Sequence, residues 1–362
     1  MGRSLGFWLG TQIAEKEFCL AKNNPSLAHD VAQIVSNACL AHDIGNPPFG
    51  HAGESAIGSW FVENKSTSVL SDLDDHERMD FQKFEGNAQG FRLLTKLQNS
   101  IDDGGLRLTH ATLGAFTKYP SISLENDGYV GTKKYGFFKD DADSFNSIAE
   151  SLGLIKRPNG GWSRHPLVFL VEAADDICYR IADLEDALKL GRVTYSEVES
   201  CFEKMLPTGH SYKPETDKDS NIGRLRAGAI SNLIDATTRA YHNNESSILN
   251  GTFSESLLEI TENGNAIKEA KKLTEERVFN WDRTVSAEIS GAQMITQILD
   301  CCMRAIEKPE LKINNMIVKI IPRYDSNMSS IKKIHTVTDF VSGMTDSYLR
   351  TIHKRLTGHG LD

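Results

Sequence analysis

The sequence lacks the patterns that mark secreted, membrane-spanning and metal-cluster proteins. No apolar run in its 362 residues comes near the roughly 18 residues that a membrane helix needs, and no basic-then-apolar signal peptide opens the chain. Its six cysteines include no CxxC pair, so neither a disulfide framework nor a zinc cluster is indicated. We therefore expect a soluble protein of the reducing cytoplasm with no membrane partner.

An excess of positive charge is also lacking. The chain carries 40 Lys and Arg against 49 Asp and Glu, a formal net charge of -9. This balance argues against a surface coated for nucleic acid, while leaving room for a local basic pocket that binds phosphates. With 40% hydrophobic residues, the chain can bury a large core as one large or two smaller domains.

Helical periodicity dominates the patterns that are present. The predicted helices cover residues 1–22, 26–43, 84–97, 109–116, 140–152, 166–190, 195–206, 222–243, 267–279, 285–306 and 337–356. Residues 121–136 favour a loop or small hairpin, and residues 313–321 alternate enough for a short strand. The highly charged residues 58–80 are predicted to be a solvated insertion. The fold class that we predict is therefore all-α, with at most a hairpin or short strand.

The stretch from residue 41 to residue 54, called the bend below, places two histidines and two carboxylates around a turn. Apolar residues 31–41 suit a helix, which Gly45 and the two prolines after it must end. Proline lacks an amide hydrogen and clashes with the preceding helical turn. His42 and Asp43 are therefore predicted to lie at a helix end.

Two further groups of polar residues share a helix face. A new helix is expected to begin near His51, and a spacing of three places His51 and Glu54 on the same face. Within the predicted helix 166–190, Asp175, Tyr179 and Asp183 are spaced four apart and form a polar stripe. Three polar groups on one stripe of a helix require a structural or functional reason.

An adjacent His–Asp pair offers a neutral nitrogen and a hard oxygen. This combination suits Mn²⁺, Fe²⁺, Co²⁺ or Zn²⁺, or Mg²⁺ if waters complete its shell. The dipeptide alone says little, and the second one in the chain, His29–Asp30, is interpreted as a solvated or capping pair. His42–Asp43 differs because the bend holds a second His and a Glu, and the distant polar stripe could deliver another carboxylate.

Four stretches, in order along the chain, resemble the deoxyguanosine triphosphate triphosphohydrolase branch of the HD-domain superfamily. They are residues 42–54 (HDIGNPPFGHAGE), 84–89 (FEGNAQ), 172–179 (EAADDICY) and 342–346 (SGMTD). The resemblance implies an all-α, metal-dependent, oligomeric enzyme that hydrolyses a deoxynucleoside triphosphate to the deoxynucleoside and inorganic triphosphate. Of the four substrates, dGTP is the one that it favours most. It also implies a catalytic HD-domain core in residues 1–200, with residues 201–362 packed on that core as further helices.

The resemblance also implies roles for single residues. His42, Asp43 and Asp175 would be ligands of a divalent metal, Mg²⁺ or Mn²⁺ first, with Co²⁺, Fe²⁺, Ni²⁺ and Zn²⁺ as alternatives. His51 and Glu54 would be the catalytic pair. The leaving 5′ oxygen of the nucleoside needs a proton or electrostatic stabilisation. His51 could donate that proton or instead activate the nucleophile.

The resemblance further implies the surroundings of the substrate. The residues that match the nucleotide pocket are Asn87, Lys118, Tyr119, Tyr179 and Asp183. For Asp183 an ion pair with Arg180 or Lys189 is the alternative, and for Tyr179 a place in the core. The expected partners are the dNTP substrate, further copies of the chain as a homo-oligomer, and a single-stranded DNA or nucleotide effector.

One feature of the family pattern is missing from the sequence. The HD pattern requires a first His from a helix well upstream of His42, and the sole earlier histidine, His29, lies on the same predicted helix. The chain therefore looks truncated at its N-terminus, and a three-ligand site is expected to hold metal less tightly. Two alternative functions follow: another HD-domain nucleotide phosphohydrolase, or a catalytically weak nucleotide-binding subunit with a regulatory or oligomer-forming role.

Overall fold

The computed structural model describes residues 1–15, 26–65, 68–99, 105–125, 127–158, 160–207, 209, 217–279 and 281–358. Over these residues the chain forms helices and no sheet, and Lys156 and Trp162 make an isolated antiparallel bridge. The all-α prediction is confirmed. Residues 16–22 of the predicted helix 1–22 and most of the polar linker between residues 207 and 221 lie outside the described residues.

The first ten helices provide the bend and its surroundings. They are α1 Gly2–Glu15, α2 Leu27–Ala41, α3 His51–Glu63, α4 Ser68–Ser71, α5 Asp75–Gln82, α6 Gly86–Arg92, α7 His110–Phe116, α8 Ala142–Ser151, α9 Val168–Lys189 and α10 Tyr195–Lys204. The π-helical turn η1 Leu93–Leu97 extends α6, and the 3₁₀ turns η2 Val130–Thr132 and η3 Lys139–Asp141 lie in the loop before α8.

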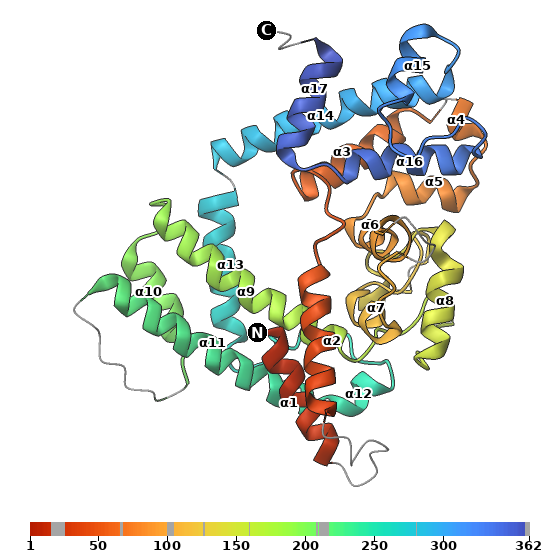
Figure 1. Cartoon of the computed structure of the whole chain (residues 1–362). Coiled ribbons are helices and arrows are strands. Elements are labelled where there is room, and N and C mark those ends of the chain that lie inside the picture. The colour runs from red at the N-terminus through yellow and green to blue at the C-terminus, as the bar shows by residue number, and fades with distance from the viewer. Residues whose placement is uncertain are drawn as a thin grey trace.

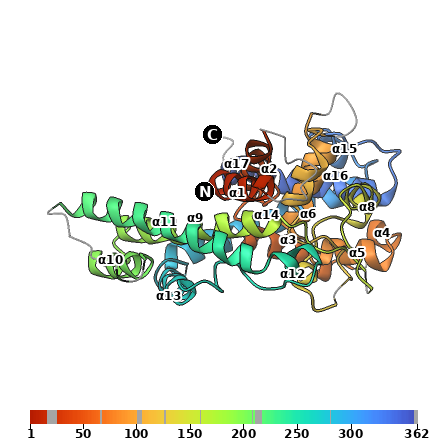
Figure 2. The same ribbon diagram turned by 90° about the horizontal axis from the view of Figure 1, so that it is seen from below.

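Seven more helices complete the chain. They are α11 Lys218–Asn243, α12 Glu245–Leu249, α13 Gly264–Thr274, α14 Asp282–Glu307, α15 Lys312–Val318, α16 Ser330–Ser342 and α17 Asp346–Thr357, with the π-helical turn η4 Glu275–Phe279 after α13. Figure 1 shows α14 to α17 beside α3 and α5, while α9, α10, α11 and α13 lie together in another part of the molecule. In Figure 2, α10 and α15 lie toward opposite ends.

Three apolar clusters build this arrangement. One joins α3 and α5 to α14, α16 and α17; the second joins α1, α2 and α6 to α8 and α9; the third joins α9 to α10, α11 and α13. Ala41 packs against the second cluster and Phe49 against the first. The bend therefore crosses from one core to another, and α9, which belongs to the second and third cores, brings its polar stripe to the start of that crossing.

The prediction of a solvated segment at 58–80 is wrong. Trp60, Phe61, Leu70 and Leu73 are buried in the first cluster, where burying a large apolar side chain contributes about 1.5–3 kcal/mol. The run of charge has a local purpose instead. Asp74 and the glutamate three residues after it form a capping box at the start of α5, which satisfies two backbone amides.

Two predictions in the C-terminal part are also wrong. Residues 313–321 contain helix α15 rather than a strand. Ile313 and Met316 are exposed, whereas Asn314 and Val318, four residues apart, are buried. The predicted helix 337–356 is divided into α16 and α17 at residues 343–345, where the Thr345 side chain accepts from a backbone amide and starts a new helix.

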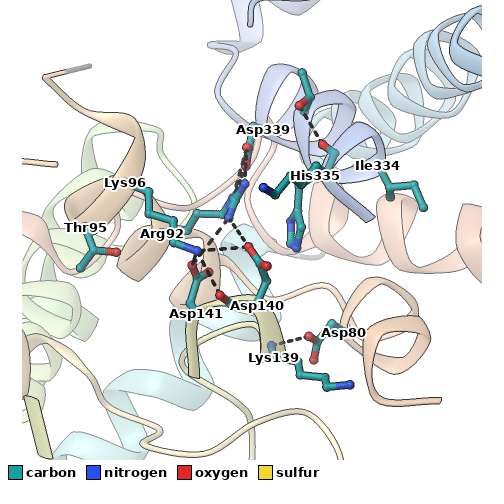
Figure 3. A network of polar contacts seen from close by, with 12 residues as sticks. Asp80, Arg92, Thr95, Lys96, Lys139, Asp140, Asp141, Ile334, His335 and Asp339 are labelled. Atoms are coloured by element: carbon teal, nitrogen blue, oxygen red, sulfur yellow. Dashed lines mark hydrogen bonds and ion pairs between the residues drawn. The ribbon is translucent and has the colours of Figure 1, made fainter. Parts of the chain in front are cut away.

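A buried ionic network connects α6 and α16 (Figure 3). Arg92 Nε lies 3.0 Å from Asp339 Oδ1, and Arg92 Nη2 donates to Asp339 Oδ2 over 3.1 Å. Lys96 Nζ is 2.5 Å from Asp141 Oδ1, and Gln89 Nε2 donates to Asp339 Oδ1 over 2.9 Å. Arg92 and Gln89 thereby fix α6 to α16, while Lys96 fixes η1 to η3.

Candidate functional site

The bend has the local structure that its glycine and prolines predict. Helix α2 ends at Ala41 with His42 as its C-terminal cap, and α3 begins at His51. Asn46 Nδ2 donates to Asp43 Oδ1 over 3.0 Å and holds that carboxylate at the turn. A Cβ atom on Gly45 would clash with the backbone of α6 at Gly86. Glycine is therefore required where the two chain segments touch.

The first half of the bend brings His42, Asp43 and Asp175 together. His42 Nε2 lies 3.1 Å from Asp43 Oδ2 and 3.1 Å from Asp175 Oδ1, so α9 delivers the carboxylate to the end of α2. His42 Nδ1 donates to the carbonyl oxygen of Cys39 over 2.7 Å. A carbonyl can only accept, so Nδ1 carries a proton and Nε2 is the nitrogen turned toward the two carboxylates.

These contacts dominate the electrostatics of the trio. Hydrogen bonds to Asp175 and then to Asp43 raise the pKa of His42 to about 10. The hydrogen bond from His42 holds the pKa of Asp43 below its usual value, and the positive charge of His51 contributes in the same direction. Both halves of the bend therefore lie within electrostatic reach of each other.

The donor set of the trio is of the kind that binds a divalent ion. Two ligands at right angles around an ion, each at about 2.1 Å, lie about 3.0 Å apart, close to the 3.1 Å between the imidazole nitrogen and each carboxylate. In the part of the chain that the structure describes, no group of three or more His, Cys, Asp or Glu side chains is already arranged to hold a metal ion. As placed, the imidazole hydrogen-bonds both carboxylates directly.

The second half of the bend pairs His51 with Glu54 on the first turn of α3. His51 Nδ1 is 2.7 Å from Glu54 Oε2, and Glu54 Oε1 accepts from the amide of Gly86 over 2.7 Å. The Glu54 side chain is only 9% exposed, whereas that of His51 is 84% exposed. A buried carboxylate fixed by a backbone amide thus holds an imidazole that faces solvent.

Both members of this pair favour their charged forms. The hydrogen bond to Glu54 raises the pKa of His51. Burial would raise the pKa of Glu54, but hydrogen bonds from His51 and Gly86 lower it overall. A cavity of about 750 Å³ opens beside the pair, lined on its far side by Glu85 and Lys134. Lys134 Nζ is 2.6 Å from Glu85 Oε1.

The structure divides the predicted nucleotide-pocket residues between two places. Asn87 donates to Glu85 over 2.9 Å and so belongs beside the cavity. Lys118 lies 2.9 Å from Glu172 on α9, and the ring of Tyr119, next in the chain, is buried. Lys118 is therefore attached to α9, whereas Tyr119 also lies within electrostatic reach of Lys134 beside the cavity.

Tyr179 and Asp183 continue the stripe on α9. Tyr179 is 47% exposed, and burial, followed by the charges of Asp183, Asp43 and Asp175, raises its pKa. The Tyr179 side chain therefore lies within electrostatic reach of Asp43 and Asp175. Burial raises the pKa of Asp183 to about 6. Arg180 Nη1 is 4.0 Å from Asp183 Oδ2, which is the ion pair that the sequence offered as the alternative to a nucleotide contact.

Known proteins resemble the chain along most of its length. A sequence-family model described as a phosphohydrolase-associated domain matches residues 261–355. A deoxyguanosinetriphosphate triphosphohydrolase-like protein of Synechocystis is 37% identical over 378 residues, covering 100% of this chain and 84% of the relative. One of Pseudomonas aeruginosa is 38% identical, covering 99% and 83%. The chain belongs to the deoxyguanosinetriphosphate triphosphohydrolase-like family. A deoxyguanosinetriphosphate triphosphohydrolase of Yersinia enterocolitica is 26% identical over 89% of the chain.

Sequence reasoning missed several polar residues around the site of this family member. Arg164, whose side chain is fully buried, donates to the Lys118 carbonyl over 2.8 Å and to Glu172 over 3.1 Å. Glu172 opens the motif 172–179 and could have been found from it, because it lies one helical turn before Asp175 and Asp176. Arg164 and the Lys134–Glu85 pair follow no pattern that sequence reasoning uses.

The described residues contain no helix that is both long and apolar enough to cross a membrane. The longest helices, α11 and α14, each carry several charged side chains along their length. This finding agrees with the absence of a long apolar run in the sequence.

Proposed function

We propose that the chain is a metal-dependent hydrolase that converts deoxynucleoside triphosphates to the deoxynucleoside and inorganic triphosphate. The substrate that we propose first is dGTP. The observation that carries this proposal is the pair of polar groups at one bend. A His–Asp–Asp trio lies at its first half, and an exposed imidazole held by a buried carboxylate lies at its second half. Membership of the deoxyguanosinetriphosphate triphosphohydrolase-like family supports the same reaction.

His42, Asp43 and Asp175 are the residues that would hold a divalent ion, Mg²⁺ or Mn²⁺ first. When bound, the ion would supply a Lewis acid that polarises the phosphate and offsets its negative charge. His42 has the required orientation, because its Nδ1 donates to the Cys39 carbonyl and its Nε2, which must lose its proton before it binds an ion, faces the carboxylates. Such a contact from the second ring nitrogen orients a metal-binding histidine.

His51 is the proposed proton donor to the leaving 5′ oxygen. Its Nδ1 is engaged by Glu54, which leaves Nε2 to meet the substrate. The hydrogen bond to Glu54 raises the pKa of His51 and so favours the charged ring, and the lowered pKa of Glu54 favours the ionised form of its partner. A positioned acid of this kind accelerates a reaction by about 10²- to 10⁴-fold. A donor also predicts that kcat falls as pH rises through the raised pKa, whereas a general base would lose activity as pH falls.

The stripe on α9 supplies the proposed contacts with the nucleotide. Lys118 carries the positive charge for the triphosphate, and Glu172 and Arg164 hold its side chain and backbone in place. Tyr179 presents an exposed ring beside the trio, where it can stack on the sugar or base or exclude a 2′-hydroxyl. The expected homo-oligomer, nucleotide or single-stranded DNA effector, cytoplasmic location and two-domain division stay predictions.

The experiment is an assay of all four dNTPs with Mg²⁺ and with Mn²⁺ in which every phosphate product is identified. Release of inorganic triphosphate with the free deoxynucleoside supports the proposal. Pyrophosphate or monophosphate as the product favours another HD-domain phosphohydrolase. Thermal stabilisation by dGTP without any turnover favours a nucleotide-binding regulatory subunit, and either result overturns the proposal.

A further inference from the structure

The residue that leads into His51 has an unusual backbone conformation. Phe49 has φ 61° and Gly50 has φ 55°, so two consecutive residues lie in the left-handed region. Glycine adopts this region at little cost, whereas phenylalanine does so only when the surroundings hold it there. The turn that presents His51 is therefore maintained by contacts outside itself.

Those contacts come from the C-terminal helices. The Phe49 amide donates to Asp346 Oδ1, at the start of α17, over 3.0 Å. A Cβ atom on Gly291 of α14 would clash with the Phe49 ring, so the ring lies directly on the α14 backbone. The guanidinium of Arg350, also on α17, lies 5.7 Å from the centre of the ring. Phe49 is thus held by its amide and by its ring.

The position of Phe49 and Gly50 determines the first turn of α3. Gly50 occupies the N-terminal cap of α3, and its carbonyl accepts the Glu54 amide over 3.0 Å. His51 and Glu54 are the first and fourth residues of that helix. A shift of the Phe49–Gly50 turn therefore moves both members of the pair, while the Gly86 amide that binds Glu54 stays on α6.

We propose that Asp346 is a positioning residue for the His51–Glu54 pair and that it acts through the Phe49 amide. Gly291 completes this arrangement, because the absence of a side chain there lets the Phe49 ring pack on the α14 backbone. The part of the inference that concerns catalysis rests on the proposed function. Both residues lie in the 261–355 segment that matches the phosphohydrolase-associated domain, and Asp346 ends the 342–346 motif. The C-terminal helices thereby take part in the reaction without touching the substrate.

The first test compares Asp346→Ala, Asp346→Asn and Asp219→Ala in the full chain. Asn retains an oxygen that can accept from the Phe49 amide, and Ala does not. Asp219 is the matched control because it lies in the first turn of α11, which packs on α9 and α10. The readouts are the His51 imidazole pKa, followed by NMR and assigned with His51→Gln, and kcat and KM for dGTP.

We expect Asp346→Ala to lower the His51 pKa toward its ordinary value and to reduce kcat by about 10- to 100-fold with KM little changed. Asp346→Asn should recover most of both losses, and Asp219→Ala should match the unaltered protein. A folded Asp346→Ala protein with an unchanged His51 pKa overturns the proposal. If the unaltered chain releases no triphosphate, the proposed function fails, but the NMR measurement still decides the positioning role.

The second test remains decisive if Asp346→Ala does not fold. Gly291→Ala pushes a methyl group against the Phe49 ring and leaves every polar contact in place. Gly223→Ala, on α11, is the matched control because a Cβ there meets open space. We expect the His51 pKa to fall in Gly291→Ala and to stay unchanged in Gly223→Ala. An unchanged His51 pKa in both variants overturns the proposal.

Discussion

The bend pairs histidines with carboxylates and the Arg92 network pairs Arg and Lys with carboxylates, and the two clusters differ in their exposure. In the network, Arg92 pairs with Asp339 and Lys96 with Asp141, and the side chains of Arg92 and Asp141 are 10% and 0% exposed. In the bend, His42, Asp43 and His51 have side chains that are 35%, 60% and 84% exposed. The centre of the network, at Arg92 and Asp141, is enclosed, whereas the bend exposes Asp43 and His51 to a ligand.

His335, beside the network, and His51, in the bend, show how exposure changes the pKa of a histidine. His335, beside the network, has its ring centre 4.9 Å from that of Phe81 and 5.0 Å from that of Phe138. Burial, followed by the charges of Arg92 and Lys96, lowers its pKa well below the usual value, whereas a carboxylate raises that of His51. A buried ionic cluster can serve the fold, and a site for chemistry needs an open path as well.

The largest expected effect is a loss of activity in a protein that still folds. We expect His51→Gln to lower kcat for dGTP by about 10²- to 10⁴-fold, because the proton donor is lost. Its effect on stability should stay within about 1 kcal/mol, because the side chain is exposed and the glutamine amide can still donate to the buried Glu54. Triphosphate release and thermal unfolding measure the two. His110→Gln is the matched control, since His110 is the exposed first residue of α7, and an equal loss of kcat in it would contradict the assignment.

The next effect breaks the fold. We expect Asp339→Ala to lower the free energy of unfolding by about 3 kcal/mol, because it leaves the buried Arg92 guanidinium without its main partner. Urea denaturation measures the loss. Replacing both residues, as Arg92→Met with Asp339→Leu, should recover much of it, because no buried charge is then left unpaired. A loss under about 1 kcal/mol in Asp339→Ala would show that the network is not structural.

A smaller effect is the stabilisation of the protein by a metal ion bound at the trio. Mn²⁺ at a hundred times its dissociation constant should raise the free energy of unfolding by about 2.7 kcal/mol. Asp175→Asn should abolish this rise, and Asp176→Asn should keep it, because Asp176 interacts with Arg180 rather than with His42. Thermal unfolding of metal-stripped protein, with and without Mn²⁺, measures both. Equal stabilisation of the two variants would remove Asp175 from the ligand set.

The smallest effect concerns pH and the enclosed histidine. Because the pKa of His335 is lowered in the folded protein, the unfolded chain binds the extra proton as pH falls below about 6.5, and stability is lost. Between pH 6.5 and pH 5 the free energy of unfolding should therefore fall, and protonation of this histidine in the unfolded chain contributes to that fall. His335→Gln should remove that part of the acid sensitivity, as followed by urea denaturation at each pH. His242→Gln, at an exposed position on α11, should leave it unchanged.

The bend could be predicted because its causes are local. Proline and glycine end α2 whatever surrounds them, and a spacing of three puts His51 beside Glu54 on any helix. The contact of His42 with Asp175 was predicted from the family resemblance, and it is 3.1 Å in the structure. Metal binding and the catalytic roles stay predictions.

The remaining errors and omissions have long-range causes. Arg92 and Asp339 are 247 residues apart in the chain, and no periodic pattern relates them. Residues 58–80 were judged by their charge, although their apolar side chains are buried by α14 and α16. The alternation in 313–321 was interpreted as a strand because the sequence does not show that Ile313 and Met316 face solvent. Tertiary packing decided each of these cases.

The close approach of the bend to α6 has a consequence for protein engineering. A side chain at Gly45 would meet the α6 backbone, and one at Gly86 would meet Asn46 and Glu54. Saturation mutagenesis at these two positions would therefore yield mostly misfolded protein. Libraries aimed at a new base or sugar preference should instead vary Tyr179, whose ring is exposed beside the trio. The rigid and the evolvable parts of this site lie on different helices, and they can be altered one at a time.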